Sequence, residues 1–364
     1  MEKLIIEKCK KILLKMKKIS LDNPFTLIEN KKKYFRTKIN KLTRFHFNNC
    51  KIYRDILTKF NYQKNKEYKL ESLPFISVRS FKNYEMLSVN RNKIFKILKS
   101  SGTSGSKLSQ IFLDKKTSEV QQRSLMNISK DFIGNDRKPM LVIDSKSILR
   151  NQKEFSARAA AILGFSMYAK DMVFLLNEKN EINYDALEKF MNKYNDQTKM
   201  IFGFTYMIWQ HFFEKLKDLK KYDFSNSLIL HGGGWKKLND KKISNEKFKT
   251  EIKKYFGIKK VMNYYGMAEQ TGSIFFECDQ GFFHCSNFSE ILIRDKKFKL
   301  CKFHEKGIVQ TISILPKSYP GHNFITEDIG IIYGENDCKC GRMGKYFKIM
   351  GRIENAELRG CSDV

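Results

Sequence analysis

Residues 94–113, IFKILKSSGTSGSKLSQIFL, place a loop of hydroxyls, glycines and a lysine between two strand-like apolar segments. In the loop, residues 100–107, the glycines let backbone N–H groups turn toward an anion and the hydroxyls add donors. Lys107 adds a mobile positive charge, so the loop predicts a phosphate cradle. It is not a Walker A loop, because G-x-x-x-x-G-K-[ST] is absent and a strand rather than a helix follows. A flexible surface turn is the alternative.

Outward from this loop, apolar segments of strand length alternate with segments of helical periodicity. The strand-like segments are largely apolar, which is typical of strands buried on both faces of a parallel sheet. They are Met140–Asp144, Lys199–Phe204, Ser227–Leu230 and Lys260–Tyr264. Helices are predicted over Thr117–Phe132 (with a threonine cap), Ser156–Leu163, Tyr206–Leu219 and Lys242–Phe256. The alternation predicts an α/β fold with a parallel sheet.

The two ends of the chain differ from this core. Residues 1–70 are charged and predicted to be helical, whereas short strands with turns between about 273 and 345 indicate a smaller, more antiparallel β section. We therefore divide the chain into a helical N-terminal region (1–70), an α/β core that includes the β-rich section (71–345) and a short, polar, hinge-like tail (346–364).

Composition narrows the class of protein. The chain has 364 residues, of which 41% are hydrophobic, so it can bury a large core. Its net charge of +30 would attract nucleic acid, an anionic membrane surface or an acidic protein. The lysines are spread along the chain without a nucleic-acid motif, so we interpret most of them as solvated surface. An acidic carrier protein stays open as a partner, and no specific nucleic-acid partner is expected.

The same sequence predicts a cytoplasmic protein without a transmembrane segment. No run is apolar enough to span a bilayer, and the lysine-rich start lacks the apolar block of a secretory signal.

Three loops that follow predicted strands carry the candidate site. Ligands of parallel α/β sheets bind beyond the carboxyl ends of the strands, so these loops are expected to converge. Besides the cradle, they are the glycine triplet Gly232–Gly234 and the turn Tyr264–Glu269. Glycines allow close approach of a flat ligand such as a purine, Tyr265 could stack on it, and Glu269 could hold Mg²⁺. A plain turn, core packing and a surface carboxylate are the respective alternatives.

Two later residues fit the same ligand. Asp328, in the turn TEDIG, could accept hydrogen bonds from both hydroxyls of a ribose. The guanidinium of Arg352 could bind ribose or phosphate as a fork.

Together these segments resemble the adenylate-forming superfamily of acyl-CoA synthetases and firefly luciferase. Within it, the chain is similar to the fatty-acyl protein synthetases of LuxE type, with phenylacetate-CoA ligases as more distant relatives. The resemblance covers roughly residues 70–364 and is carried by SSGTSGSK (100–107), HGGGWKK (231–237), NYYGMAEQTGSIF (263–275), TEDIG (326–330), CKCGRMGKY (338–346) and GRIENAELRGCSD (351–363). It implies the large N-terminal domain of the adenylate-forming fold, with layered parallel sheets, helices and a β section.

The resemblance implies that ATP and a carboxylic acid, such as a fatty acid, react to an acyl-adenylate and pyrophosphate. It places Mg²⁺ at Glu269, ribose at Asp328 and ribose or phosphate at Arg352. It assigns the phosphates to Ser100, Ser101, Gly102, Thr103, Ser104, Gly105 and Lys107, and the adenine to Gly232, Gly233, Gly234 and Tyr265. Lys107 and Glu269 would act in catalysis, because the reaction requires two anions to be held together and their charge neutralised.

One departure from the superfamily matters. The superfamily continues past the Gly-Arg hinge into a mobile C-terminal domain of about a hundred residues, which carries a catalytic lysine. This sequence stops at Val364, so we expect the C-terminal small domain to be truncated, which argues against CoA ligation. The LuxE resemblance implies instead that the acyl group passes to Cys361 and then to a partner protein such as a reductase or carrier protein. A thiolate is an effective acyl acceptor, and an incidental tail cysteine is the alternative.

Four residues predict a structural zinc site. Cys278-x5-His284 and Cys338-x-Cys340 could supply three sulfurs and one nitrogen in a tetrahedron. Phenylacetate-CoA ligase relatives can carry zinc in this region, so the resemblance supports the same site. Cys285 and Cys301 are alternative ligands, and four reduced, partly buried residues without metal are the structural alternative.

The sequence thus predicts an ATP-dependent acyl-protein synthetase. A CoA or carrier-protein ligase is the alternative among enzymes, and a basic nucleic-acid-binding protein is the alternative from another class.

Overall fold

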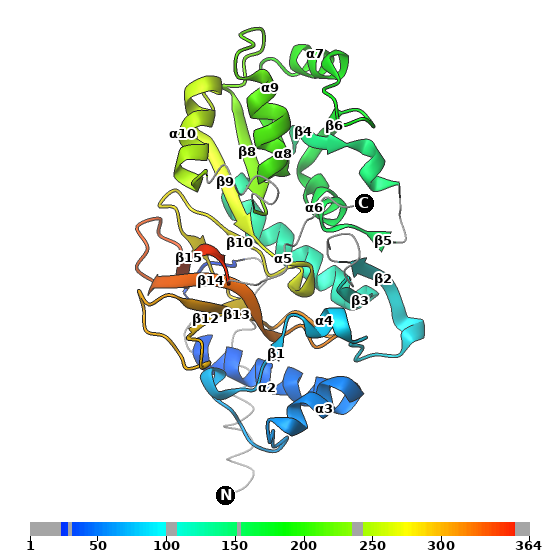
Figure 1. Ribbon diagram of the computed structural model, residues 1–364, viewed down its shortest axis with the longest axis vertical. Coiled ribbons are helices and arrows are strands. Elements are labelled where there is room, and N and C mark those ends of the chain that lie inside the picture. Colours follow the sequence, from blue (N-terminus) through cyan, green and yellow to red (C-terminus); the bar gives the residue numbers. More distant parts are fainter. Residues whose placement is uncertain (1–22, 28–30, 100–107, 151–153, 235–242, 354–364) are drawn as a thin grey trace, which may run out of the picture.

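The computed structural model describes residues 23–27, 31–99, 108–150, 154–234 and 243–353 (Figure 1). The central layer is a sheet built from β4 (Lys138–Ser145), β6 (Ala169–Leu176), β7 (Lys199–Phe204), β8 (Ser227–Gly232), β9 (Lys260–Tyr265) and β10 (Phe275–Phe276). Its strand order is β10-β9-β8-β7-β4-β6. Neighbouring strands from β9 to β6 pair in parallel, and β10 pairs with β9 in the antiparallel sense.

Helices cover both faces of this sheet. Alternate residues of a strand point to opposite faces, and both sets are apolar here because both faces are covered. Leu141, Ile201 and Ile229 pack on α7 (Tyr184–Lys193), α8 (Thr205–Met207), the π-helix η5 (Ile208–Phe213), α9 (Glu214–Leu216) and α10 (Asn245–Phe256). Met140, Phe202 and Leu230 pack on the opposite face, against α5 (Lys115–Ile133) and α6 (Ala157–Phe165).

A second sheet forms the β section below the first in Figure 1. It contains β11 (Phe283–His284), β12 (Ser289–Arg294), β13 (Gly307–Ser313), β14 (Asn323–Glu335) and β15 (Lys345–Arg352), in the order β11-β15-β14-β13-β12. These strands pair in the antiparallel sense, and the short strand β1 (Ile76–Ser77) joins β14 in parallel. The N-terminal helices α2 (Lys31–Asn49) and α3 (Lys51–Lys59) pack below this sheet, and Phe35, Tyr53 and Leu57 share a buried cluster with Ile312 and Phe324.

A third, small sheet contains the two strands between which the predicted cradle lies in the sequence. The strands β2 (Ile94–Lys99) and β3 (Gln110–Asp114) flank it and pair in the antiparallel sense, and β5 (Glu154–Phe155) pairs in parallel with β2. Short helical turns complete the described elements: α4 (Ser80–Asn83), η1 (Leu70–Ser72), η2 (Arg91–Lys93), η3 (Lys146–Leu149), η4 (Ser166–Tyr168) and η7 (Ala268–Gln270).

The predicted α/β fold with a parallel sheet is confirmed, and three details differ from the prediction. The cap of α5 is Asp114, whose carboxylate accepts a hydrogen bond of 2.7 Å from the backbone N–H of Thr117, so the threonine cap was wrong. The strand β6 and the helix α7 were not predicted. The strand β15 spans residue 346, at which the predicted hinge-like tail begins.

Among the helices of the described residues, none combines the length and the apolar character that crossing a bilayer requires.

Candidate active site

The glycine triplet and the tyrosine turn lie side by side at the carboxyl ends of β8 and β9, where Gly232 is paired with Tyr264. A Cβ atom on Gly232 would come within 2.5 Å of the Tyr264 ring, so the ring occupies the space beside this glycine. Gly233 has a φ of +75°, which glycine adopts without strain. A Cβ atom on Gly234 would meet no described atom within 4 Å, which leaves its backbone accessible to a flat ligand.

Thr205 holds the glycine turn in place. Its Oγ1 lies 3.1 Å from the carbonyl oxygen of Gly232, 2.9 Å from that of Gly233 and 2.9 Å from Nδ1 of His231. Burial lowers the pKa of His231 to about 3, so this ring is neutral near pH 7. The single hydroxyl proton of Thr205 is donated to the two carbonyl oxygens, so the hydroxyl oxygen accepts from His231. This fits the tautomer of His231 in which Nδ1 carries the proton. Sequence reasoning did not identify Thr205, because a single threonine after a strand forms no motif.

Tyr265 and Asp328 connect the two sheets. The Tyr265 hydroxyl donates a hydrogen bond of 2.6 Å to the Asp328 carboxylate, and burial together with the charge of Asp328 raises the pKa of Tyr265 well above its usual value. The Tyr265 ring packs with Phe275, Phe283 and Phe347. Tyr265 therefore orients Asp328, and its predicted stacking on adenine stays a prediction.

Arg352 lies opposite Asp328 in the pairing of β14 with β15, and its Nε is 3.5 Å from a carboxylate oxygen of Asp328. The same guanidinium donates to Glu327, which is 6% exposed and also accepts a hydrogen bond from Arg79. Glu327 was not predicted, although it stands beside Asp328 in the same turn. Two arginines and two carboxylates thus form one polar network at the position predicted for ribose.

Glu269 lies in the buried turn η7 and is 1% exposed, so a surface carboxylate is excluded. The helix α5 supports this turn: Thr271 donates a hydrogen bond of 2.6 Å to Gln121, and Gln121 lies 3.2 Å from the Tyr319 hydroxyl. On the other side, the backbone oxygen of Glu269 would lie 2.6 Å from a Cβ atom on Gly321. The turn is therefore tightly packed, and a carboxylate oxygen is a donor that Mg²⁺ prefers.

Several predicted residues lie outside the described part of the chain. They are Ser100, Ser101, Gly102, Thr103, Ser104, Gly105, Lys107 and Cys361. The structure therefore brings together Gly232–Gly234, the tyrosine turn, Asp328 and Arg352, and the convergence of the cradle and of Cys361 on them stays a prediction.

The four predicted zinc ligands are brought together. One ligand atom from each of Cys278, His284, Cys338 and Cys340 lies within 4.8 Å of all the others, and His284 Nε2 is 3.3 Å from Cys340 Sγ. Sulfur and nitrogen atoms bound to one zinc ion lie roughly 3.3–3.8 Å apart, as its bond lengths of about 2.3 and 2.0 Å require. Burial raises the pKa of Cys338 to about 12 and lowers the pKa of His284 to about 4. Three sulfurs and a neutral imidazole in this arrangement fit tetrahedral zinc. The alternative ligands Cys285 and Cys301 are not in this group.

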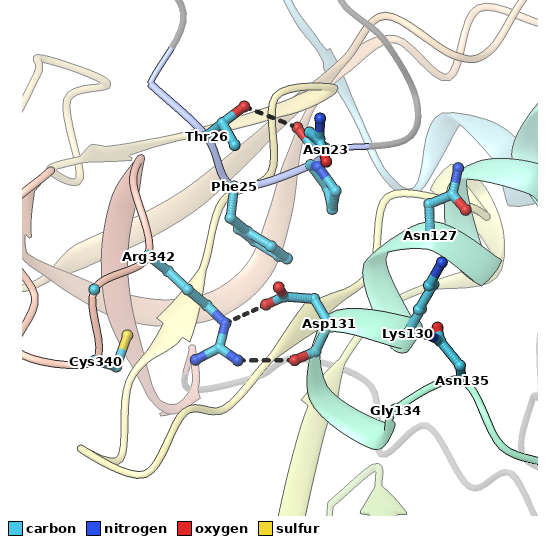
Figure 2. A pocket seen from close by; sticks show the side chains of 12 residues that line it. Asn23, Phe25, Thr26, Asn127, Lys130, Asp131, Gly134, Asn135, Cys340 and Arg342 are labelled. Carbon is cyan, nitrogen blue, oxygen red and sulfur yellow. Dashed lines mark hydrogen bonds and ion pairs between the residues drawn. The ribbon is translucent and has the colours of Figure 1, made fainter.

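A hollow of about 620 Å³ borders this cluster at Cys340 (Figure 2). At its edge, Arg342 donates hydrogen bonds to the carboxylate and the backbone oxygen of Asp131. The hollow lies near the first residue of β9, because Lys260 donates to the backbone oxygen of Phe132, next to Asp131. It therefore lies at the amino ends of the parallel strands, whereas Gly232 and Tyr265 lie at their carboxyl ends. The hollow is thus not the candidate nucleotide site.

The family model described as "Acyl-protein synthetase, LuxE" matches residues 13–364. No match is found among the curated proteins. Among solved structures, the chain is similar to an open conformation of 2-hydroxyisobutyryl-CoA ligase in complex with 2-HIB-AMP and CoA. The TM-score is 0.70 at 14% identity, covering 89% of this chain and 75% of the ligase.

The same ligase in its postadenylation state, in complex with 2-HIB-AMP, also has a TM-score of 0.70 at 14% identity, covering 91% of this chain and 69% of the ligase. These likenesses show the adenylate-forming fold, and the family model covers nearly the whole chain. The chain therefore belongs to the LuxE family of acyl-protein synthetases and is an acyl-adenylate-forming enzyme.

Proposed function

We propose that this enzyme uses ATP and Mg²⁺ to activate a fatty acid, loads the acyl group on its own Cys361 and passes it to a partner protein. The observation that carries the proposal is the continuous set of contacts from the glycine turn through Tyr264 and Tyr265 to Asp328 and Arg352. It links the segments predicted for adenine with those predicted for ribose, across the junction of two sheets. The required ATP and reduced thiol both favour a cytoplasmic location.

The first step is acid activation. A carboxylate oxygen of the acid attacks the α-phosphorus of ATP, the bond between this phosphorus and pyrophosphate breaks, and acyl-AMP forms. In this arrangement Gly234 would contact adenine, and Asp328, oriented by Tyr265, would accept hydrogen bonds from the ribose. Arg352 and Lys107 would offset phosphate charge, and the buried Glu269 would hold Mg²⁺, which supplies charge neutralisation between the phosphates.

The second step is acyl transfer. The Cys361 thiolate attacks the acyl carbonyl, the bond to the AMP oxygen breaks, and AMP leaves with the bonding electron pair. A thioester remains on the enzyme until an acceptor on the partner, such as a reductase or carrier protein, takes the acyl group.

The test uses radiolabelled acids of increasing chain length with ATP and without CoA. We expect acid-dependent exchange of pyrophosphate into ATP, greatest for fatty acids, and label fixed on the wild-type chain. Cys361→Ser should retain the exchange and lose the fixed label, whereas Cys301→Ser, the matched control in the β section, should retain both.

Two outcomes contradict the proposal. If label is fixed equally on Cys361→Ser, another residue accepts the acyl group. If label leaves the enzyme only when CoA is added, the enzyme is a CoA ligase, a reaction class that includes the structurally similar 2-hydroxyisobutyryl-CoA ligase.

We further propose that Cys278, His284, Cys338 and Cys340 bind a structural zinc ion. The two cysteine-containing turns lie on separate segments of the β section, so a shared metal would fasten them together. Protein purified with zinc should contain about one equivalent, and Cys338→Ser should lose it and melt at a lower temperature. Cys285→Ser is the matched control, a buried cysteine outside the cluster, and should retain the metal. A wild-type protein that holds no zinc would exclude the site.

A further inference from the structure

The loop between β12 and β13, residues 295–306, displays three large apolar side chains at the surface. Phe298, Leu300 and Phe303 are 50%, 47% and 46% exposed, and they stand within six consecutive residues. Single exposed apolar residues are common on soluble proteins, but three of them on one short loop make that loop a candidate interaction site. We name residues 295–306 the apolar-basic loop.

The same loop is strongly basic. Its lysines are all exposed and are Lys296, Lys297, Lys299, Lys302 and Lys306. Its two carboxylates accept hydrogen bonds from the backbone of the loop. Asp295 accepts hydrogen bonds of 2.8 Å from the N–H groups of Lys297 and Lys299, and Glu305 accepts one of 2.8 Å from the N–H of Lys302. The loop therefore presents positive charge around its apolar side chains.

The backbone of the loop holds Phe298 in a conformation that is unfavourable for a bulky side chain. Phe298 has a φ of +61°, a conformation that is rare for bulky residues and relaxed for glycine. The turn is anchored by Arg294, which is 5% exposed and donates hydrogen bonds to the backbone oxygens of Phe298 (2.8 Å) and Glu71 (2.7 Å). The Phe298 ring contacts the Phe75 ring edge-on, with centroids 5.8 Å apart, and half of the side chain stays exposed. The anchored turn therefore holds an apolar side chain at the surface.

We propose that the apolar-basic loop docks the enzyme on an anionic lipid bilayer. Phenylalanine and leucine side chains enter the boundary between headgroups and acyl chains, while lysines extend to the phosphates. A bilayer fits better than an acidic protein, because exposed apolar side chains and lysines alternate along the loop, as insertion at a charged interface requires. Arg294 of β12 pairs with Ile308 of β13, and Ile308 pairs with Ile329 of β14. The base of the loop therefore lies two inter-strand spacings, about 10 Å, from Ile329. The ribose-binding candidate Asp328 directly precedes Ile329, so a docked enzyme would hold its nucleotide site near the membrane surface.

The experiment is co-sedimentation of the full chain with vesicles, without acid or ATP, so its result does not depend on the proposed function. Vesicles of phosphatidylcholine with 30% phosphatidylglycerol are compared with pure phosphatidylcholine. We expect binding to the anionic vesicles that weakens with added salt, and at least tenfold weaker binding for F298S/L300S/F303S. That variant keeps every charge, so simple adsorption of a +30 protein would leave its binding unchanged.

The matched control removes three exposed side chains elsewhere: F60S/Y184S/L219S, at positions 60%, 48% and 41% exposed. It should bind like the wild type. Equal binding by the two triple variants, whether both bind or both fail, overturns the proposal, and so does unchanged binding by the loop variant, the outcome expected if an acidic protein is the true partner.

A second measurement does not depend on the triple variant folding. In F303W, the new tryptophan should be quenched by vesicles with brominated acyl chains, and in the control F60W it should not. No difference in quenching between F303W and F60W overturns the proposal.

Discussion

At the scale of single residues, two glycines of the triplet differ in what surrounds them. Gly232 leaves room for the Tyr264 ring, whereas Gly234 has open space around it within the described part of the chain. The two glycines are separated only by Gly233, yet packing constrains the first and leaves the second open to a ligand. A pair of alanine substitutions can therefore distinguish a structural from a binding role.

Gly232→Ala should lower the free energy of unfolding by about 1–3 kcal/mol, because the new methyl group overlaps the Tyr264 ring. Gly234→Ala should leave that free energy nearly unchanged and raise the KM for ATP. Chemical denaturation and steady-state kinetics measure the two effects. Equal loss of stability in both variants would show that the whole turn is packed, and an unchanged KM in Gly234→Ala would exclude contact with adenine.

Glu269 is the residue most directly tied to the proposed metal chemistry. Glu269→Gln keeps the shape of the buried side chain and removes its negative charge, so acid-dependent pyrophosphate exchange should fall by roughly 100-fold or more. Excess Mg²⁺ should restore part of the rate. The exposed Glu246 of α10 supplies the control, and Glu246→Gln should exchange at the wild-type rate. Exchange by Glu269→Gln at more than half the wild-type rate would exclude the metal-binding role.

At the scale of elements, a pair of buried histidines joins α2 to the loop before β14. The rings of His46 and His322 stack with centroids 4.7 Å apart, and both residues are fully buried. His46 Nδ1 lies 2.8 Å from the Ser88 hydroxyl, and His322 Nε2 lies 2.9 Å from the Thr43 hydroxyl. Burial lowers the pKa of His46 to about 3 and the pKa of His322 well below its usual value. Both rings are therefore neutral in the folded protein near pH 7.

This pair predicts a loss of stability in mild acid. Above the unfolded-state pKa of about 6.5, neither state binds the proton and no penalty arises. Below it, the unfolded chain is protonated and the folded chain is not, so the free energy of unfolding falls by about 1.4 kcal/mol per pH unit for each such histidine. Between pH 6.5 and 5, His46→Gln should show a shallower slope than the wild type.

The wild-type protein, measured at the same pH values, provides the comparison. Denaturation curves at four pH values distinguish the two proteins. A slope in His46→Gln equal to that of the wild type would contradict the neutral, buried state of this ring.

The strands also show what could be predicted from sequence. The strand β7 was predicted with its observed bounds, because five of its six residues form an unbroken run without a polar side chain, which is typical of a buried strand. The strand β6 was missed, since it lies at the sheet edge and begins with partly exposed residues around Lys170 and Asp171. Edge strands lack the continuous apolar pattern that identifies central strands.

The candidate site was predictable to the extent that it lies in motifs. The cluster of Cys278, His284, Cys338 and Cys340 could be predicted as candidate metal ligands from residue type and from the family resemblance, and the pairing of β11 with β15 helps bring its two halves together. Thr205 and Glu327 could not be predicted, because their roles arise from the proximity of strand ends that only the fold creates.

At the scale of the whole molecule, the net charge of +30 dominates the electrostatics. Excess like charge destabilises a compact state through self-repulsion, and salt screens this repulsion. The melting temperature at pH 7 should therefore rise between 20 and 200 mM NaCl, as calorimetry would show. A fall would mean that ion pairs such as Arg44–Glu67, which salt also screens, outweigh the repulsion.

The hydrogen bond from Asn323 to the backbone oxygen of Pro74 spans 249 residues and lies where β1 joins β14. Contacts of such long range form slowly, because the chain loses the entropy of closing the loop before it gains the favourable free energy of the contact. On the ribosome, the N-terminal helices must wait until β14 has been translated before their apolar faces can pack on this sheet. Nascent chains of this enzyme should therefore depend on chaperones, and fragments that end before β14 should be degraded rather than accumulate.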